Sequence, residues 1–156
     1  MVHDSQAGIV TGLRFAFDDG GRSSAGFRGA AGDCVCRSIA IATGLPYREV
    51  YDALNGLAES ERTGKRKRGR SSARTGVYKT TYRRYLASLG WRWVPTMKIG
   101  TGCTTHLRAG DLPASGRLIV CVSRHMTAVI DGVIRDTADP SRDGSRCVYG
   151  YFEKGL

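Results

Sequence analysis

The sequence predicts an α+β fold in which helices come first and an antiparallel sheet follows. Three segments with helical spacing of apolar residues cover about residues 34–43, 46–59 and 78–89. From about residue 91 to 152 the pattern changes to short β-branched and aromatic runs separated by Gly, Pro and Asp. Helices followed by strands are typical of the α+β class. The length of 156 residues fits one folded unit, so we expect a single domain over residues 1–156.

Boundary residues support each predicted helix. Asp33 is a favourable N-cap for the first helix, and Gly44 is a favourable stop after it. Pro46 suits the first position of the second helix, because its missing N–H needs no partner there. The third helix repeats the apolar period over residues 78–89. Residues 1–32 are glycine-rich and weakly patterned, and "GLRFAF" within them is a candidate edge strand.

The composition excludes several classes of protein. Hydrophobic residues make up 41% and charged residues 24% of the chain, which is ordinary for a folded protein and unlike a disordered one. The apolar run "LIVCV" is too short to cross a bilayer, and the N-terminus lacks the pattern of a signal peptide. The five cysteines are an odd number in a chain of this size, so we expect reduced thiols. These features favour an unanchored, cytoplasmic protein without membrane contact.

A basic segment, residues 62–76, separates the second and third predicted helices. It holds seven basic residues and no acidic one, and without it the net charge falls from +10 to +3. Its Gly and Ser content indicates a flexible loop. The candidates for contact with nucleic acid or an acidic partner are its central cations: Lys65, Arg66, Lys67, Arg68 and Arg70. This segment supports an alternative function, a non-enzymatic nucleic-acid-binding module whose phosphate contacts release counterions.

A histidine and an aspartate are predicted to share one face of a β-hairpin. Asp131 and Gly132 are typical of a two-residue turn, in which both positions need positive φ. In the resulting register Asp136 lies diagonally across from His125, within reach of a hydrogen bond. A carboxylate bound to one imidazole nitrogen leaves the other free to take a proton, whereas the structural alternative is a packed or surface histidine. A register shifted by one residue would make Asp139 the orienting acid instead.

Cys34 is the candidate nucleophile. It stands in the first turn of the first predicted helix together with Cys36. The positive end of a helix lowers the pKa of a thiol and can bind a developing oxyanion. Cys34 should point toward the open end of the helix and Cys36 toward its buried side, so Cys36 is a secondary candidate. The alternative is that both are small buried hydrophobic residues. Cys121 and Cys147 lie in apolar strands and are interpreted as structural.

The order of these residues resembles that of the papain-like cysteine peptidases. "DCVCRSIAIATG" resembles the Asp-Cys helix start of small bacterial or phage-type members, and "RHMTAVIDGVIRDT" is similar to their His-x-x-Ala-Val hairpin. The resemblance implies a papain-like domain with a triad of Cys34, His125 and Asp136. It implies a thiol hydrolase, a peptidase or isopeptidase, that acts on a peptide or protein substrate through an acyl-enzyme. A papain-like acyltransferase is the alternative within the same chemistry.

One departure from the family concerns the oxyanion hole. Many members place a glutamine shortly before the cysteine, whereas Arg28 stands six residues before Cys34 here. Gln6 is the sole glutamine in the chain. The sequence leaves three alternatives open: Gln6 folds back, Arg28 and the Cys34 backbone N–H bind the oxyanion, or the site hydrolyses amides poorly.

Zinc binding is a further role that the cysteines suggest. Cys34, Cys36, Cys103 and His106 could supply four ligands, but Cys-x-Cys is not the usual knuckle and no second tight pair repeats it. Cys103 and His106 also lack an orienting acid in the sequence, so we interpret them as structural rather than as a second thiol–imidazole pair. We expect no metal and no cofactor.

Overall fold

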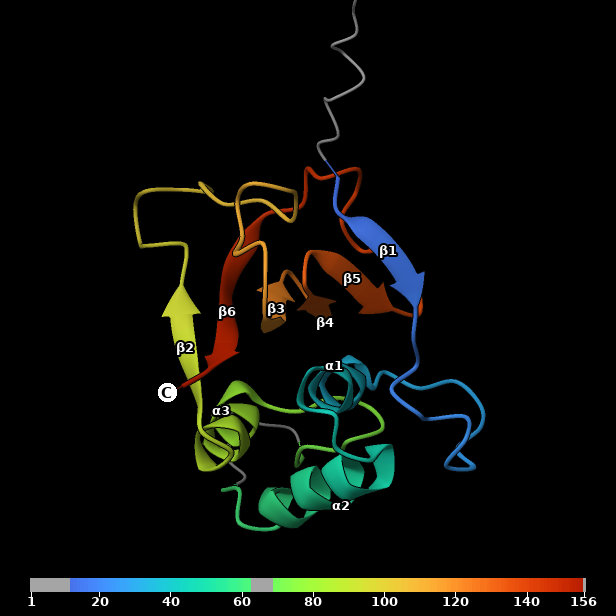
Figure 1. The fold of residues 1–156 in the computed structure, drawn as a ribbon. Coiled ribbons are helices and arrows are strands. Elements are labelled where there is room, and N and C mark those ends of the chain that lie inside the picture. Colours follow the sequence, from blue (N-terminus) through green and yellow to red (C-terminus); the bar gives the residue numbers. More distant parts are fainter. Residues whose placement is uncertain (1–11, 63–68, 156) are drawn as a thin grey trace, which may run out of the picture.

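A computed structural model of the chain describes residues 12–62 and 69–155. Within them it has three helices on one side of a six-stranded mixed sheet, which confirms the α+β class (Figure 1). The helices are α1 (Cys34–Thr43), α2 (Tyr47–Ala58) and α3 (Lys79–Ser88), so their bounds differ from the predicted ones by no more than one residue. The strands are β1 (Arg14–Phe17), β2 (Trp91–Pro95), β3 (Arg117–Val122), β4 (His125–Ile130), β5 (Val133–Asp136) and β6 (Val148–Lys154).

The sheet differs from the prediction at one edge. Its strand order is β1-β5-β4-β3-β6-β2, and β1 pairs in parallel with β5, with Phe17 opposite Asp136. The antiparallel sheet predicted over about residues 91–152 is confirmed, because β2 to β6 all pair in antiparallel fashion, and so is the candidate edge strand in "GLRFAF". The parallel strand β1 before the helices departs from the expected order of helices first. A parallel pair needs a long crossover, which the intervening helices provide. A four-residue, mostly exposed strand that pairs through its backbone carries no sequence signal of its direction.

Helix α1 lies at the centre of the fold. It packs on β4 and touches β3 and β5, while α2 covers its other side and α3 packs on β2 (Figure 1). Its residues are buried around most of its circumference, including Cys36, Ile39 and Ala42, which are fully buried. The helix ends where predicted, because Gly44 adopts a left-handed conformation with φ of 77° and donates its N–H to the Ala40 carbonyl. The packing of α1 on β4 holds the first residue of the helix, Cys34, against the sheet.

The β4–β5 hairpin has the predicted register. Ala128 pairs with Arg135, and the turn residues Asp131 and Gly132 have φ of 49° and 77°. Both turn positions therefore use the positive φ that Asp-Gly tolerates. The alternation of side chains from this turn places residues 125 and 136 on the same face of the sheet.

Gly150 on β6 lets the indole of Trp93 lie directly on the strand. A Cβ at this position would overlap the indole and lie 2.8 Å from the Val94 carbonyl oxygen. We expect Gly150→Ala to lower the free energy of unfolding by about 1–3 kcal/mol, the usual cost of overpacking. Gly56 in α2 is the matched control, since a Cβ there meets open space. Gly56→Ala should raise stability by up to about 1 kcal/mol. Urea denaturation measures both, and a Gly150→Ala protein as stable as the wild type would contradict this packing.

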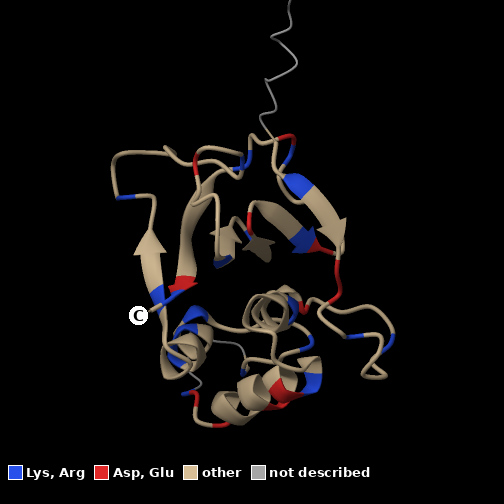
Figure 2. Ribbon diagram, in the orientation of Figure 1, with Lys and Arg blue, Asp and Glu red and all other residues tan. Residues whose placement is uncertain are grey.

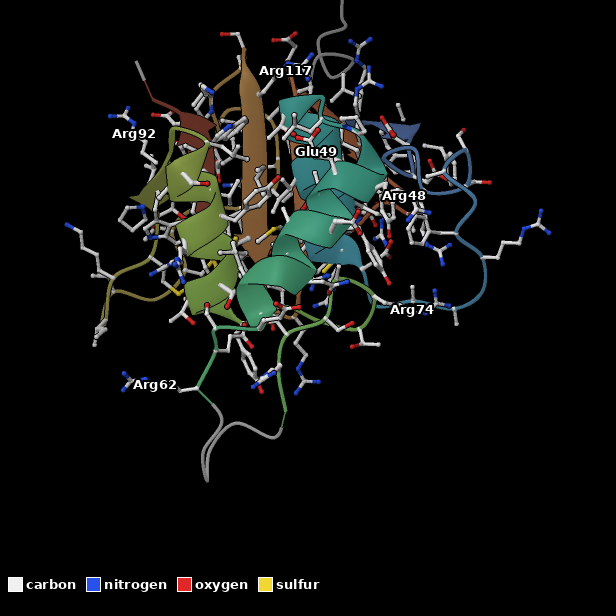
Figure 3. All side chains as sticks on the ribbon, turned by 90° about the horizontal axis from the view of Figure 1, so that it is seen from below. Arg48, Glu49, Arg62, Arg74, Arg92 and Arg117 are labelled. Atoms are coloured by element: carbon white, nitrogen blue, oxygen red, sulfur yellow. A yellow bond between two sulfur atoms is a disulfide. The ribbon has the colours of Figure 1, made fainter. Side chains whose placement is uncertain are left out.

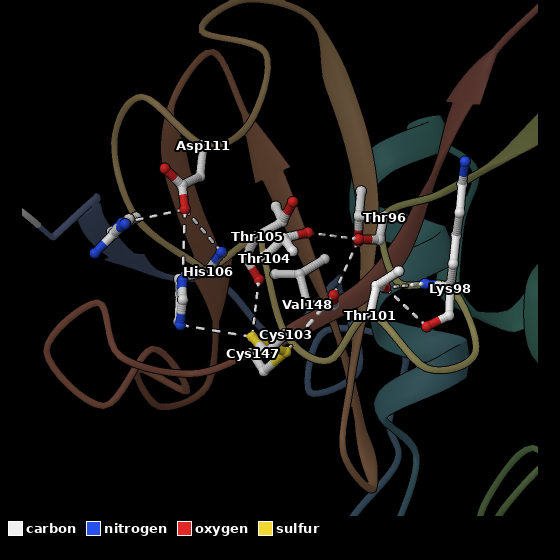
Figure 4. The surroundings of a disulfide bond; sticks show 11 residues. Thr96, Lys98, Thr101, Cys103, Thr104, Thr105, His106, Asp111, Cys147 and Val148 are labelled. Carbon is white, nitrogen blue, oxygen red and sulfur yellow. Dashed lines mark hydrogen bonds and ion pairs between the residues drawn. A yellow bond between two sulfur atoms is a disulfide. The ribbon is translucent and has the colours of Figure 1, made fainter.

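A disulfide joins Cys103 to Cys147, whose Cα atoms are 5.9 Å apart (Figure 4). The prediction of reduced thiols is therefore wrong for these two cysteines, while the three described as free are Cys34, Cys36 and Cys121. The pairing arises because the chain before β3 runs beside the start of β6, where Val148 donates its N–H to the Thr105 carbonyl at 2.8 Å. Contacts between segments separated by 44 residues leave no local sequence signal. Disulfides persist mainly in oxidising compartments, a condition that the predicted cytoplasmic location does not provide.

Charged residues lie on helices, strands and loops (Figure 2). Helices α1 and α3 contain Lys or Arg but no Asp or Glu, whereas α2 contains both kinds. None of the helices in residues 12–62 and 69–155 is long and apolar enough to cross a membrane. Lys65, Arg66, Lys67 and Arg68 of the basic segment lie outside the described residues. Arg70 is described and exposed.

Candidate active site

The structure brings Cys34, His125 and Asp136 together at one end of the contact between α1 and the sheet. Cys34 is the first residue of α1, His125 the first of β4, and Asp136 the last of β5. Because α1 packs on β4, the start of the helix meets the start of the strand. The start of α1 and the β4–β5 hairpin therefore bring a thiol, an imidazole and a carboxylate next to one another in space.

The His125–Asp136 contact fixes the imidazole. Nε2 of His125 lies 2.7 Å from Oδ2 of Asp136. An ionised carboxylate can only accept hydrogen bonds, so Nε2 carries the proton and Nδ1 is the nitrogen left for the thiol. The backbone N–H of Thr137 donates to the other carboxylate oxygen at 2.7 Å. The carboxylate is thereby held in a single orientation toward the ring.

The three groups perturb one another's pKa values. Burial raises the pKa of the Cys34 thiol, but the hydrogen bond and charge of His125 and a hydrogen bond from the Met126 backbone bring it below its ordinary value. Burial lowers the pKa of His125, whereas its hydrogen bonds with Asp136 and Cys34 raise it to about 9. Burial raises the pKa of Asp136, and the hydrogen bond from His125 turns the net shift downward. These directions favour the pair of thiolate and imidazolium over the neutral pair.

Arg37 is a site residue that sequence reasoning missed. Its guanidinium hydrogen-bonds Asp33 and lies 3.3 Å from Oδ1 of Asp136. The side chains of Asp33 and Asp136 are only 2% and 4% exposed. Arg37 therefore bridges two buried carboxylates one helical turn after Cys34. The signal was present in the sequence, as the single cation in the apolar helix "CVCRSIAIAT".

Asp33 does not act as the predicted side-chain cap. It stands at the N-cap position of α1, but its carboxylate makes no hydrogen bond to the first turn. It instead accepts a hydrogen bond from the Tyr47 hydroxyl at 2.6 Å, and Arg22 Nε lies 3.4 Å away. Arg22, Arg37 and the Tyr47 hydroxyl contact the carboxylate, which would otherwise accept a hydrogen bond from a backbone N–H of the first helical turn. Asp33 therefore supports Arg37 rather than the helix end.

The secondary candidates Cys36 and Asp139 lie elsewhere. Cys36 is fully buried, its thiol faces the Tyr47 carbonyl, and burial raises its pKa to about 12. Asp139 is exposed, and its carboxylate accepts the Ser141 N–H at 2.9 Å, as expected of a turn residue. The two-residue turn leaves Asp136, not Asp139, facing the imidazole. Neither secondary candidate is placed to act on the thiol.

The structure does not place the Arg28 side chain beside Cys34, where the predicted oxyanion role would need it. Arg28 is exposed and does not line the cavity at Cys34. Its backbone carbonyl accepts a hydrogen bond at 2.9 Å from Arg74, which is labelled in Figure 3. Gln6 lies outside the described residues. The backbone N–H of Cys34 remains as a candidate donor, because the N–H groups of a first helical turn have no partner within the helix.

Cys34 and His125 line a cavity of about 630 Å³ between the helices and the sheet. This volume is typical of a pocket that takes a small ligand or a short peptide segment. Aromatic side chains form part of its wall: Tyr82, Trp93 and Tyr149. The buried thiol of Cys121 also reaches this cavity, where burial raises its pKa to about 12. Of the two cysteines that line the cavity, only Cys34 has a lowered pKa.

The second cysteine–histidine pair is part of the disulfide region. The Cys103 sulfur, bonded to Cys147, lies 3.5 Å from His106 Nε2 (Figure 4). Asp111 lies 3.6 Å from Nδ1 of the same ring and accepts the His106 backbone N–H. The described part of the chain contains no group of three or more His, Cys, Asp or Glu side chains that could hold a metal ion.

Comparisons with known protein families, curated proteins and solved structures found no match to this chain. The papain-like resemblance therefore stays a prediction from two short motifs.

Proposed function

We propose that this protein is a papain-like thiol hydrolase, a peptidase or isopeptidase with Cys34 as nucleophile, His125 as acid and base, and Asp136 as orienting acid. The observation that carries the proposal is the placement, on the wall of one cavity, of a thiol at a helix start and an imidazole that is bound at 2.7 Å to a buried carboxylate. Nucleophile, base and orienting group in this order are the requirement for nucleophilic catalysis.

In the first half of the reaction, the Cys34 thiolate attacks the carbonyl carbon of an amide. A carbon–sulfur bond forms, and the carbonyl oxygen develops negative charge next to the first turn of α1, where the Cys34 N–H is a donor. His125 Nδ1 then gives its proton to the amide nitrogen, and the carbon–nitrogen bond breaks. The amine leaves and a thioester on Cys34 remains.

In the second half, water attacks the thioester while His125 Nδ1 accepts the water proton. The carbon–sulfur bond breaks, the carboxylic acid leaves, and the thiolate and imidazolium are restored. Asp136 stays ionised throughout and holds Nε2–H. An acyltransferase would use the same thioester with an amine in place of water.

Alkylation by iodoacetamide tests the nucleophile. We expect rapid stoichiometric labelling of Cys34, with a pH dependence whose lower limb lies below the ordinary thiol value of 9.0. His125→Ala removes the hydrogen bond and charge that lower this pKa, so labelling at neutral pH should slow by about tenfold or more. Cys36→Ala is the control, because the Cys36 thiol is buried and should not contribute. Equal labelling rates in the wild type and His125→Ala would count decisively against the proposal.

Hydrolysis itself is tested with a mixture of peptides in heavy-oxygen water. A hydrolase incorporates the heavy oxygen into the new carboxyl group, and mass spectrometry detects it. Transfer of the acyl group to an added amine without this incorporation would identify the acyltransferase instead. Cys34→Ala should lose either activity.

A further inference from the structure

The ionisable groups that line the cavity leave a positive surface. Asp33 is the sole carboxylate among the described lining residues, and it is already bound to Arg37 and Tyr47. Arg37 in turn forms ion pairs with two carboxylates, those of Asp33 and Asp136. The other lining cations beside the imidazole are Lys79 and Arg124.

Lys79 and Arg124 have no acidic partner in the part of the chain that the structure describes. Neither makes an ion pair there, although ion pairs are formed by several other arginines. Both side chains are exposed at the rim of the cavity. Lys79 comes from the helical layer and Arg124 from the turn between β3 and β4, immediately before His125. Two unmatched positive charges therefore border the cavity from two layers of the fold.

Both residues are unfavourable for the local structure they occupy. Lys79 is the first residue of α3, where a cation meets the positive end of the helix dipole. Arg124 has φ of 58°, a conformation that favours Gly or Asn. Residues that contradict local preference at the edge of one cavity are typical of functional rather than folding requirements.

We propose that the cavity selects peptide substrates that carry a carboxylate close to the scissile bond, and that Lys79 and Arg124 are the specificity-determining residues. This inference rests on the proposed function and names its substrate class. A carboxylate is the ordinary anion of a peptide, from an acidic side chain or from the C-terminus. It would satisfy the two cations that the protein itself leaves unmatched, and the charges would strengthen binding and steer association.

A pair of alkylating reagents tests the charge preference at Cys34. Iodoacetate and iodoacetamide form the same carbon–sulfur bond and release the same iodide, but only iodoacetate carries a carboxylate. The measured quantity is the ratio of their rate constants at Cys34. We expect Lys79→Gln and Arg124→Asn each to lower this ratio by about two- to fourfold, the effect of one charge at several ångströms in water. Added salt at about 0.5 M should lower the wild-type ratio in the same direction.

The control variants remove cations outside the cavity. Lys98→Gln and Arg28→Gln change exposed residues that do not line it, so their ratios should equal that of the wild type. Lys79→Gln and Arg124→Asn suit their local structure, and their melting temperatures should match or exceed the wild-type value. An unchanged ratio in a variant with both Lys79→Gln and Arg124→Asn, whose Cys34 is still reactive, overturns the proposed preference for a carboxylate but not the nucleophile. Absence of selective labelling by both reagents contradicts the nucleophile, and with it the proposed function.

Peptide substrates distinguish the two sources of the carboxylate. For any cleaved peptide, loss of turnover on C-terminal amidation identifies the terminal carboxylate. Loss of turnover on changing an acidic residue to its amide identifies a side chain. Turnover that responds to neither change overturns the proposal.

Discussion

Replacement of Asp136 by asparagine is expected to reduce turnover by about a hundred- to ten-thousand-fold, the usual cost of losing an orienting acid. The amide cannot hold Nε2–H as an ionised carboxylate does, and it removes the negative charge that stabilises the imidazolium. The pKa of His125, raised to about 9 by Asp136 and Cys34 against burial, should then fall. Cys34 stays in place, but a less stable imidazolium also lowers the pKa of its thiol less, so the loss concerns both the base and the nucleophile.

The pH dependence of turnover shows whether the pKa of His125 falls in the Asp136→Asn variant. Protonation of the leaving amine needs the imidazolium, so wild-type activity should fall as the pH rises through about 9. In Asp136→Asn this upper limb should move to lower pH. Asp139→Asn is the matched control, because the Asp139 carboxylate is exposed and bonds only within its turn. Similar turnover in the two variants would exclude Asp136 as the orienting acid.

Replacement of Arg37 by leucine is expected to lower the free energy of unfolding by about 3–5 kcal/mol near neutral pH. The change leaves two carboxylates, Asp33 and Asp136, with 2% and 4% exposure and without the guanidinium that joins them. A buried charge that loses its partner is costly because water cannot replace it. Chemical denaturation of the wild type and the variant measures the difference.

The control for Arg37 is an exposed ion pair. Arg92 contacts Glu153 with its side chain 70% exposed, so Arg92→Leu should cost less than about 1 kcal/mol. Asp136 has a lowered pKa, so its contribution to stability is present above the ordinary carboxyl value of 3.8 and is lost as the pH falls through its folded pKa. The deficit of Arg37→Leu should therefore shrink in acid. Equal deficits in the two arginine variants would contradict the buried bridge.

Arg37 is also expected to position Asp136, an effect that stability alone does not measure. Because Arg37 contacts the Asp136 oxygen that does not bind the imidazole, Arg37→Lys should keep the positive charge but lose the planar guanidinium, and it should retain part of the turnover. The upper limb of its pH profile should lie between those of the wild type and Arg37→Leu. A purely structural arginine would change stability without moving this limb.

The sequence by itself determined the helices and the hairpin that carries the candidate base. Gly44 ends α1 through its hydrogen bond to the carbonyl of Ala40 in the last turn, and Asp131-Gly132 sets the register of β4 and β5. Both signals act between neighbouring residues, so they could be recognised without a structure. The placement of His125 and Asp136 on one face followed from that register, and the position of Cys34 followed from the helix start.

Only the tertiary structure decided which distant segments meet. It paired β1 with β5, joined Cys103 to Cys147, and set Arg37 between two carboxylates from different elements. It likewise brought the helix start of Lys79 and the turn of Arg124 to one cavity. These contacts depend on how segments far apart in the sequence pack together, and a local pattern contains no information on that packing. Local patterns in the sequence therefore sufficed to name the candidate site residues, whereas the charges that surround them depended on the fold.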